Sequence, residues 1–245
     1  MRRISAKVKI ISIILLVVSI IAIITTYIVN DNIREFIDTK ILKKEISDDS
    51  VKNIYTNSSV IKTMSLAKNV VTLSSGELKV YDFEGNAKNT IKMKIGNPIY
   101  DIEDRYLGIA DKNVTKIYLI EDDKLLWEKT LDVTVEKIEV NRNGYMAVVT
   151  KDSVYKSVVL VYSNKGELLL KSYVSNGYVI DTEISPDNKY LVIGEVDYSK
   201  TYIESTVKVI DIKKAMKSEE NSVVNTFVKD KLLINLKIKE NLSII

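Results

Sequence analysis

The feature that most constrains this chain is a strand-turn-strand phrase that occurs three times along it. In residues 182–194, TEISPDNKYLVIG, a strand of alternating apolar residues leads through a Ser-Pro-Asp-Asn turn into a second strand. Proline presets φ in the turn, and Asp and Asn bond their own backbone. The phrase recurs at 136–149 and 99–110, so that Tyr106, Tyr145 and Tyr190 stand 39 and 45 residues apart. Units of roughly 40 residues made only of strands are typical of propeller blades.

Alternation of apolar and polar residues predicts four units of four strands each. The units span 58–96, 97–133, 134–176 and 177–230, and a polar insertion at 213–221 is expected to form a helical turn or two. A small sheet of this kind is not stable alone, so each unit is expected to bury its apolar face on its neighbour. The predicted strands are 60–66, 70–74, 78–83, 87–94, 98–103, 106–110, 115–120, 125–131, 135–140, 145–150, 158–162, 168–173, 179–184, 190–194, 203–212 and 223–228.

Residues 231–245 are predicted to begin a fifth unit, with strands at 232–238 and 242–245. An array that stops there would expose a strand edge and an apolar face. We expect either a truncated version of a longer protein or missing strands supplied by residues 50–57 or by a partner, and truncation is the preferred interpretation. The predicted fold of 58–245 is therefore all-β, an incomplete propeller-like array of about four and a half antiparallel blades.

Residues 10–29 form a run of 20 residues without a charged side chain. As a helix, with a rise of about 1.5 Å per residue, the run would span about 30 Å, the thickness of a bilayer's hydrocarbon core. A cleaved signal peptide has a shorter apolar region and small residues at its exit, which TTYIVND at 25–31 lacks. The sequence therefore predicts one N-terminal transmembrane helix, an uncleaved signal anchor.

The flanks of this run predict its orientation. Arg2, Arg3, Lys7 and Lys9 precede it, whereas both signs of charge follow it. The positive-inside bias predicts a cytoplasmic tail at 1–9 and an extracytoplasmic body. Residues 30–57, with isoleucines at helix-like spacing, are expected to form an amphipathic stalk or linker.

Composition excludes several functions. The chain has neither Cys nor His, which rules out disulfides and thiolate metal sites and removes the commonest general base. The net charge of +3 comes from the basic tail, and the rest of the chain is nearly neutral. No nucleic-acid partner is therefore expected.

Two Ser-x-x-Lys matches, Ser59 with Lys62 and Ser153 with Lys156, resemble the acylating pair of penicillin-recognising enzymes. No Ser-Asp-Asn or Lys-Thr-Gly partner motif follows, and both matches fall on strand or loop sequence where a helix is required. Coincidence is the preferred interpretation.

Acidic groups stand near the repeat turns and could be calcium ligands or a carboxylate pair. No Asp-x-Asp-x-Asp-Gly loop occurs, and Asp is favoured in turns for its own backbone bonding, so solvated turns are the preferred interpretation. No catalytic, cofactor-binding or metal-binding residue is predicted, and no cofactor. The groups are Asp101, Glu103 and Asp104; Glu121, Asp122 and Asp123; and Asp181, Glu183 and Asp187.

Aromatic residues recur in register. Tyr106, Tyr145, Tyr190 and Trp127 could form a platform for a sugar or peptide, but their regular spacing favours packing between blades. They are predicted to belong to the repeat core.

These phrases resemble β-propeller repeats of the WD40-like and quinoprotein types, notably SPDNKYL at 185–191 and KLLWEKTL at 124–131. The whole layout, with NGYMAVVT at 143–150, resembles an uncharacterised bacterial family of single-pass membrane proteins with a propeller-like extracytoplasmic domain. The resemblance covers about residues 60–212. It departs at Leu170 and Asn89, which stand where the pattern has Trp127, and it implies no functional residue.

The sequence thus predicts a membrane-anchored, extracytoplasmic, non-enzymatic domain that binds or scaffolds envelope components. Its expected partners are the bilayer, through 10–29, and a protein or second copy at the open blade edge. Two alternatives stay open: a propeller hydrolase that uses carboxylates and a bound metal, and a sensor that acts through a membrane partner.

Overall fold

The computed structural model describes residues 6–30, 33, 37, 41, 42, 54, 59–112, 115–199, 201–218, 222–229 and 231–238. The chain divides into two compact units, Met1–Lys52 and Asn53–Ile245. Each unit is described below by itself.

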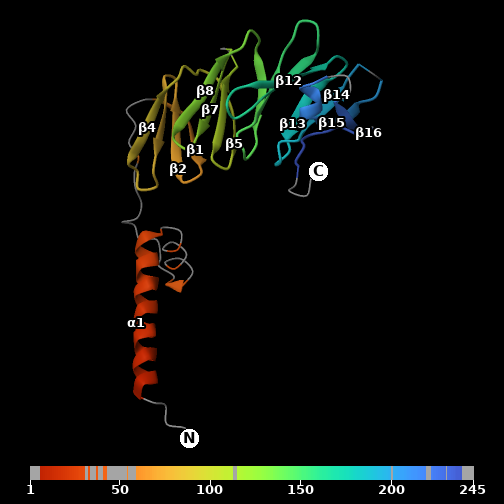
Figure 1. Cartoon of the computed structure of the whole chain (residues 1–245). Coiled ribbons are helices and arrows are strands. Elements are labelled where there is room, and N and C mark those ends of the chain that lie inside the picture. The colour runs from red at the N-terminus through yellow and green to blue at the C-terminus, as the bar shows by residue number, and fades with distance from the viewer. Residues whose placement is uncertain are drawn as a thin grey trace. The chain divides into compact units, whose positions relative to one another are not determined.

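The first unit contains helix α1, Ala6–Val29 (Figure 1). Its side chains are described at Ser12 and from Leu15 onward, and the hydroxyls of Ser19, Thr25 and Thr26 donate to helix carbonyls at 2.8 Å. In the part of the chain that the structure describes, no helix is long and apolar enough to cross a membrane. The membrane anchor stays a prediction from the sequence. Most of the predicted stalk at 30–57 lies outside the described residues.

The second unit consists of four antiparallel four-stranded sheets, each built from strands consecutive in the chain (Figure 1). Sheet 1 has β1 (Val60–Leu66), β2 (Asn69–Ser74), β3 (Glu77–Tyr81) and β4 (Ala87–Lys92), and sheet 2 has β5 (Pro98–Glu103), β6 (Tyr106–Asp111), β7 (Lys116–Glu121) and β8 (Lys124–Thr130). Sheet 3 has β9 (Val135–Val140), β10 (Met146–Thr150), β11 (Ser157–Tyr162) and β12 (Leu168–Val174), and sheet 4 has β13 (Tyr178–Ile184), β14 (Tyr190–Asp197), β15 (Glu204–Asp211) and β16 (Val223–Lys229). The expectation of four all-β units of four strands is confirmed.

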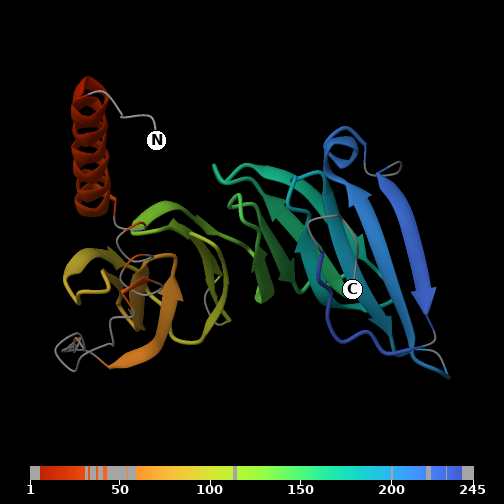
Figure 2. The ribbon, with the colours of Figure 1, turned by 90° about the horizontal axis from the view of Figure 1, so that it is seen from below.

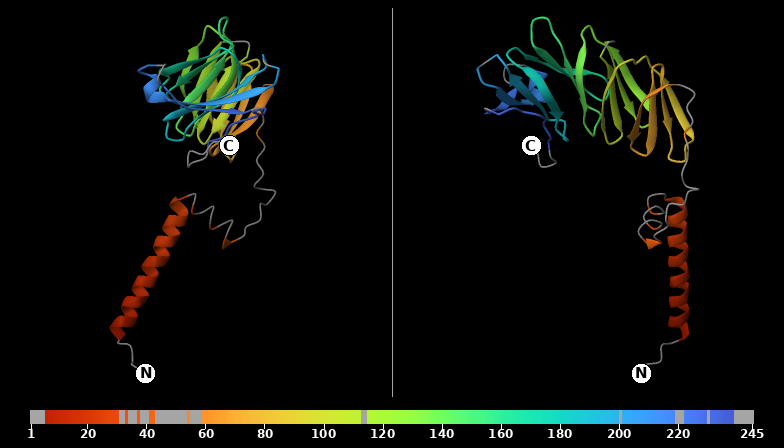
Figure 3. Two further views of the ribbon diagram at one scale, coloured as in Figure 1. Left: turned by 90° about the vertical axis from the view of Figure 1, so that its right-hand side faces the viewer. Right: turned by 180° about the vertical axis from the view of Figure 1, so that it is seen from behind.

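The sheets stack face to face in chain order, as Figures 2 and 3 show. In sheets 2 and 3, successive side chains of the second strand point to opposite faces. One set packs on the preceding sheet and the other set on the following sheet. In β6, Leu107 and Ile109 pack with sheet 1, whereas Tyr106 and Ala110 pack with sheet 3. Three successive core clusters therefore hold the array together, between sheets 1 and 2, 2 and 3, and 3 and 4.

A short helix, α3 (Ile212–Ala215), follows β15 at the start of the predicted polar insertion. Asp211 caps it, because its Oδ1 accepts a hydrogen bond from the Lys214 amide at 3.0 Å. The expected helical turn is confirmed.

Residues 231–238, where the sequence predicts the first strand of a fifth unit, run without strand pairing except for a bridge at Ile238. Leu236 and Ile238 are nevertheless buried, and with Leu233 they pack on Val192 of sheet 4. This segment thus covers part of the sheet 4 face that an open array would expose. Residues 239–245, including the second predicted strand, lie outside the described residues.

Val148→Asp and Leu191→Asp should each unfold the second unit. Both side chains are fully buried between sheets, so the new carboxylate would be buried without a partner, at a cost of about 4 kcal/mol or more. Thr90→Asp, at an exposed strand position, is the matched control and should change the unfolding free energy by less than about 0.5 kcal/mol. Urea unfolding followed by circular dichroism measures all three, and the reverse ranking would contradict the sheet register.

Candidate binding cavity

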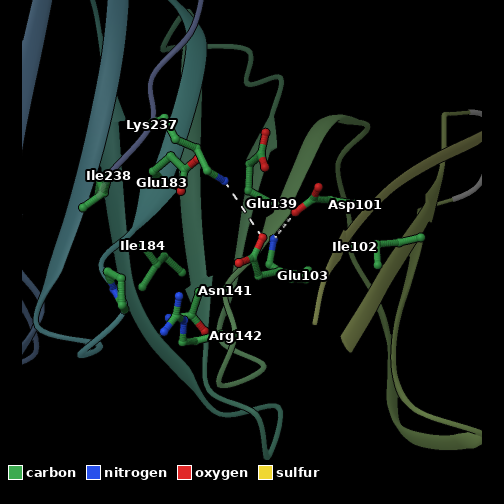
Figure 4. A pocket seen from close by; sticks show the side chains of 12 residues that line it. Asp101, Ile102, Glu103, Glu139, Asn141, Arg142, Glu183, Ile184, Lys237 and Ile238 are labelled. Atoms are coloured by element: carbon green, nitrogen blue, oxygen red, sulfur yellow. Dashed lines mark hydrogen bonds and ion pairs between the residues drawn. The ribbon is translucent and has the colours of Figure 1, made fainter. Parts of the chain in front are cut away.

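A cavity of about 610 Å³ lies where the first strands of sheets 2, 3 and 4 meet. Strands β5 and β9 are in contact, as are β9 and β13, so three sheets contribute to one wall. The charged residues that line it are Asp101, Glu103, Glu139, Arg142, Glu183 and Lys237 (Figure 4).

The first strands of sheets 2, 3 and 4 each carry a charged pair at alternate positions, and Asp101, Glu103, Glu139 and Glu183 from these pairs line the cavity. The pairs are Asp101 and Glu103 in β5, Lys137 and Glu139 in β9, and Asp181 and Glu183 in β13. Because successive side chains of a strand point to opposite faces, residues two apart share a side. The same charged spacing in three consecutive units is the sequence signal that could have revealed the cavity.

The first strands are tied to one another by these side chains. The Val140 amide in β9 donates to Asp101 Oδ2 in β5 at 2.7 Å. Lys137 Nζ lies 2.6 Å from Asp181 Oδ1 in β13 and 3.0 Å from Glu139 Oε1. Asp181 is 4% exposed, so its carboxylate depends on these partners for compensation of its lost hydration.

The 231–238 segment forms the remaining wall. The Leu236 amide donates to Asp181 Oδ2 at 2.6 Å. Lys237 Nζ lies 3.5 Å from Glu183 Oε1 and 3.9 Å from Glu103 Oε2, and therefore spans sheets 4 and 2 across the cavity (Figure 4).

Two glycines leave space for the segments whose amides donate to Asp101 and Asp181, namely β9 and residues 231–238. Gly108 pairs with Asp101, and a Cβ there would lie 2.7 Å from Val140 Cγ1 of β9. Gly194 pairs with Asp181, and a Cβ there would lie 2.1 Å from Leu233 Cδ2. The 231–238 segment thus contacts sheet 4 at a cross-strand pair of Asp and Gly, and β9 contacts sheet 2 at an equivalent pair.

Burial raises the pKa of Glu139 to about 8, with the negative charge of Asp101 adding to the effect and Lys137 opposing it. Burial also raises the pKa of Glu183, although Lys237 opposes this shift. Partial removal from water is the main reason why both carboxyls hold a proton more strongly than they would in solution.

Both lysines at the cavity stay charged. Burial alone would lower the pKa of Lys137, but its hydrogen bond to Asp181 and the neighbouring Glu139 outweigh burial, so the pKa is raised. Burial would likewise lower the pKa of Lys237. The nearby carboxylates of Glu183 and Glu103 outweigh burial, so the pKa is raised.

The solvated-turn interpretation is wrong for four of the predicted acidic residues. Asp101 and Glu103 lie in β5 and Asp181 and Glu183 in β13, and all four serve the cavity or its wall. The interpretation holds for Asp104, Asp122 and Asp187. Asp104 and Asp122 have positive φ in turns, and Asp187 accepts hydrogen bonds from Ser185 and Lys189.

The predicted aromatic residues lie away from the cavity lining. Tyr106 covers Gly144 of sheet 3, where a Cβ would lie 2.6 Å from its ring. Trp127 Nε1 donates to Asn164 O in the β11–β12 turn at 3.2 Å, and Tyr145 packs with the cluster between sheets 3 and 4. Tyr190 is half-buried, and its amide donates to Ser185 Oγ at 2.9 Å.

The remaining predicted positions are the lysines of the two Ser-x-x-Lys matches and the basic residues before the apolar run. The ammonium groups of Lys62 and Lys156 lie over the rings of Tyr100 and Tyr178, at 5.4 and 5.5 Å from the ring centres. Arg2 and Arg3 lie outside the described residues, and only the helical backbone is described at Lys7 and Lys9. Among the described residues, no three acidic side chains are grouped so that they could hold a metal ion.

The described sheets define an all-β, propeller-like domain. Solved structures of similar fold include Kluyveromyces lactis Hsv2p, at 18% identity over 78% of this chain and 64% of that one with a TM-score of 0.50. The β-propeller domain of Cps50 (Swd1) from Myceliophteria thermophila shares 12% identity over 78% of this chain and 62% of that one, also with a TM-score of 0.50. These likenesses concern the fold alone. The chain spans 53% and 54% of the length of two further Hsv2 structures that it resembles.

The chain belongs to a family described as a family of unknown function, DUF5711, whose model matches residues 42–243. No curated protein matches the sequence. The predicted resemblance to an uncharacterised propeller-like family is thereby confirmed in its coarser part, and single-pass membrane character stays a prediction.

The stability of the second unit should fall as pH rises from about 5 to about 8. Glu139 has a pKa of 4.5 when unfolded and about 8 when folded, so the folded state binds the extra proton in this interval. Bound protons stabilise the folded state below pH 4.5, and this contribution, on the order of 2–4 kcal/mol, is lost as pH rises through 8.

Glu139→Gln should reduce this dependence and raise stability at pH 8.5. The chain has no His, whose titration would otherwise obscure the interval. Thermal melts at pH 5.5 and 8.5 make the comparison, with Glu167→Gln at the β11–β12 turn as the control. Equal slopes for the wild-type and Glu139→Gln proteins would contradict the assignment.

Proposed function

We propose that the domain is a non-catalytic binding module that receives a cationic group, an ammonium or a guanidinium, in the cavity between sheets 2, 3 and 4. The observation that carries the proposal is the convergence of four carboxyl side chains from three sheets on one cavity, with the pKa values of Glu139 and Glu183 both raised. A cation bound beside these carboxyls would lower their pKa values, because a nearby positive charge favours the ionised form.

The size and the chemistry of the cavity support this ligand class. Its volume of about 610 Å³ falls within the usual range for small-molecule sites. Lys237, between Glu183 and Glu103, already supplies one ammonium there from the chain itself. The same carboxylates suit the amine of a peptide side chain or of a polyamine.

Spermidine binding measured by isothermal titration calorimetry tests this function. Binding should release protons and should strengthen from pH 6 to 8.5, because the cation replaces the proton of Glu139. Glu183→Gln should weaken binding by about tenfold, as the loss of one charged hydrogen bond does, and Glu167→Gln should not. Absence of binding at both pH values would contradict the proposal, as would an unchanged affinity in Glu183→Gln.

Glu139 also bears on a second candidate, the hydrolase that uses carboxylates and a bound metal. General acid and base groups work best with a pKa near the operating pH, and about 8 meets this condition. Turnover of a glycoside or phosphoester substrate that Glu139→Gln abolishes would favour catalysis over binding alone.

We further propose that residues 10–29 anchor the domain in the cell membrane, with residues 1–9 in the cytoplasm and the body outside. Support comes from the uncharged run and from the basic residues that precede it. The body would then bind or scaffold components of the envelope. A sensor function, the other alternative, would act through a membrane partner.

External protease on spheroplasts should digest the body and leave a protected anchor fragment. Replacing Arg2, Arg3, Lys7 and Lys9 with Glu should weaken this orientation, because the bias depends on basic residues beside the helix. Resistance of the body until the cells are lysed would contradict the extracytoplasmic assignment.

A further inference from the structure

Arg142 lines the cavity of the proposed cation site but takes no part in that proposal. In Figure 4 the carboxyl side chains from β5, β9 and β13 gather on one side of the cavity, whereas Arg142 lies apart from them, beside Asn141. Lys237 lies with the carboxyls, between Glu183 and Glu103. The cavity therefore carries a guanidinium apart from its group of carboxyls.

The turn that carries Arg142, between β9 and β10, is held by hydrogen bonds of its neighbours. Asn141 Oδ1 accepts a hydrogen bond from the Asn143 amide at 3.0 Å. The Nδ2 of Asn141 donates to Ser185 O at 3.1 Å. The Nδ2 of Asn143 donates to Pro186 O at 2.7 Å. These bonds tie the β9–β10 turn to the β13–β14 turn of sheet 4, so the backbone of Arg142 keeps its place beside the cavity whatever its side chain binds.

Arg105 shows a different use of an arginine in this fold. It lies in the β5–β6 turn of sheet 2, and its guanidinium forms ion pairs with Asp122 and, at 3.3 Å, with Glu121 of the same sheet. Arg105 thus connects parts of one sheet and lies outside the cavity lining. Arg142 belongs to the lining, where the planar fork of N–H donors of a guanidinium suits a carboxylate.

A ligand with both signs of charge fits this arrangement better than a ligand with one. The carboxyls of the cavity would repel a simple anion at Arg142, and the guanidinium would repel a simple cation beside the carboxyls. A ligand whose cation meets the carboxyls and whose carboxylate meets Arg142 avoids both costs. Glu139 and Arg142 are three residues apart in the chain, so their Cα atoms are at most about 11 Å apart. One small molecule can therefore contact both side chains.

We propose that the cavity binds a zwitterionic ligand, an amino acid or peptide with a basic side chain, whose carboxylate pairs with Arg142 and whose side-chain cation meets the carboxyls of β5, β9 and β13. The inference rests on the cation-binding function proposed above and adds the second charge of the ligand. The carboxylate accepts two parallel hydrogen bonds from the guanidinium. Amines without a carboxylate lack this contact and bind more weakly, so Arg142 determines specificity.

L-Lysine and cadaverine, titrated into the full chain at pH 8 by isothermal titration calorimetry, test this inference. The two molecules differ only in the α-carboxylate, and cadaverine carries the higher net positive charge. Attraction to the carboxyls alone would therefore favour cadaverine. We expect L-lysine to bind about tenfold more tightly, as the gain of one charged hydrogen bond does.

Arg142→Gln should abolish the preference for L-lysine and leave the affinity for cadaverine unchanged or higher. Its thermal melt should match that of the wild-type chain, because Asn141 and Asn143 hold the turn. Arg105→Gln is the matched control and should keep the preference. Cadaverine that binds the wild-type chain as tightly as L-lysine, or a preference that survives in Arg142→Gln, would overturn the inference and leave the cation site in place. Binding of neither molecule would overturn both.

Discussion

The second unit depends on the burial of sheet faces between consecutive sheets. A four-stranded sheet of this size cannot bury its own apolar side chains, so its stability comes from the neighbour on each face. Strands β6 and β10 show the consequence, because alternate residues of each strand enter different core clusters and every residue of both strands is buried. Burial of apolar surface on both faces fixes the register of strand pairing. A slip by one residue would move the side chains of each face to the opposite face.

The same stacking creates the cavity. Face-to-face packing brings the edges of β5, β9 and β13 together, and the charged residues of those edges then meet in a partly desolvated space. Ion pairs and backbone amides compensate some of the charge, notably at Asp181, while burial raises the pKa of Glu139 to about 8. These residues therefore have a structural role and a proposed binding role at once. The carboxylates that connect the sheets also determine the electrostatic potential in the cavity where a cation would bind.

Much of the fold could be predicted from the sequence because its determinants are local. Proline, glycine and asparagine fix the turns, and alternation over five to eight residues fixes the strands, as at Val135–Val140 and Tyr190–Asp197. The sequence marks the strands of the cavity by their recurring charged spacing, but local patterns could not predict that these strands meet. Asp101 and Asp181 stand near turn sequence in the chain, and only the packing between sheets decides that they face β9 and the 231–238 segment. The partial cover of sheet 4 by that segment also depends on a contact between Gly194 and Leu233 that no local pattern encodes.

The most direct test of this account is a double-mutant cycle between Lys137 and Asp181, which belong to different sheets and meet at the edge of the cavity. Unfolding free energies of Lys137→Met, Asp181→Asn and the double variant give their coupling. If sheets 3 and 4 stack as described, the coupling should be about 1–3 kcal/mol, as for a contacting, largely buried charge pair. Additive effects within about 0.3 kcal/mol would show that the two side chains do not meet, and would contradict both the stacking and the cavity that it builds.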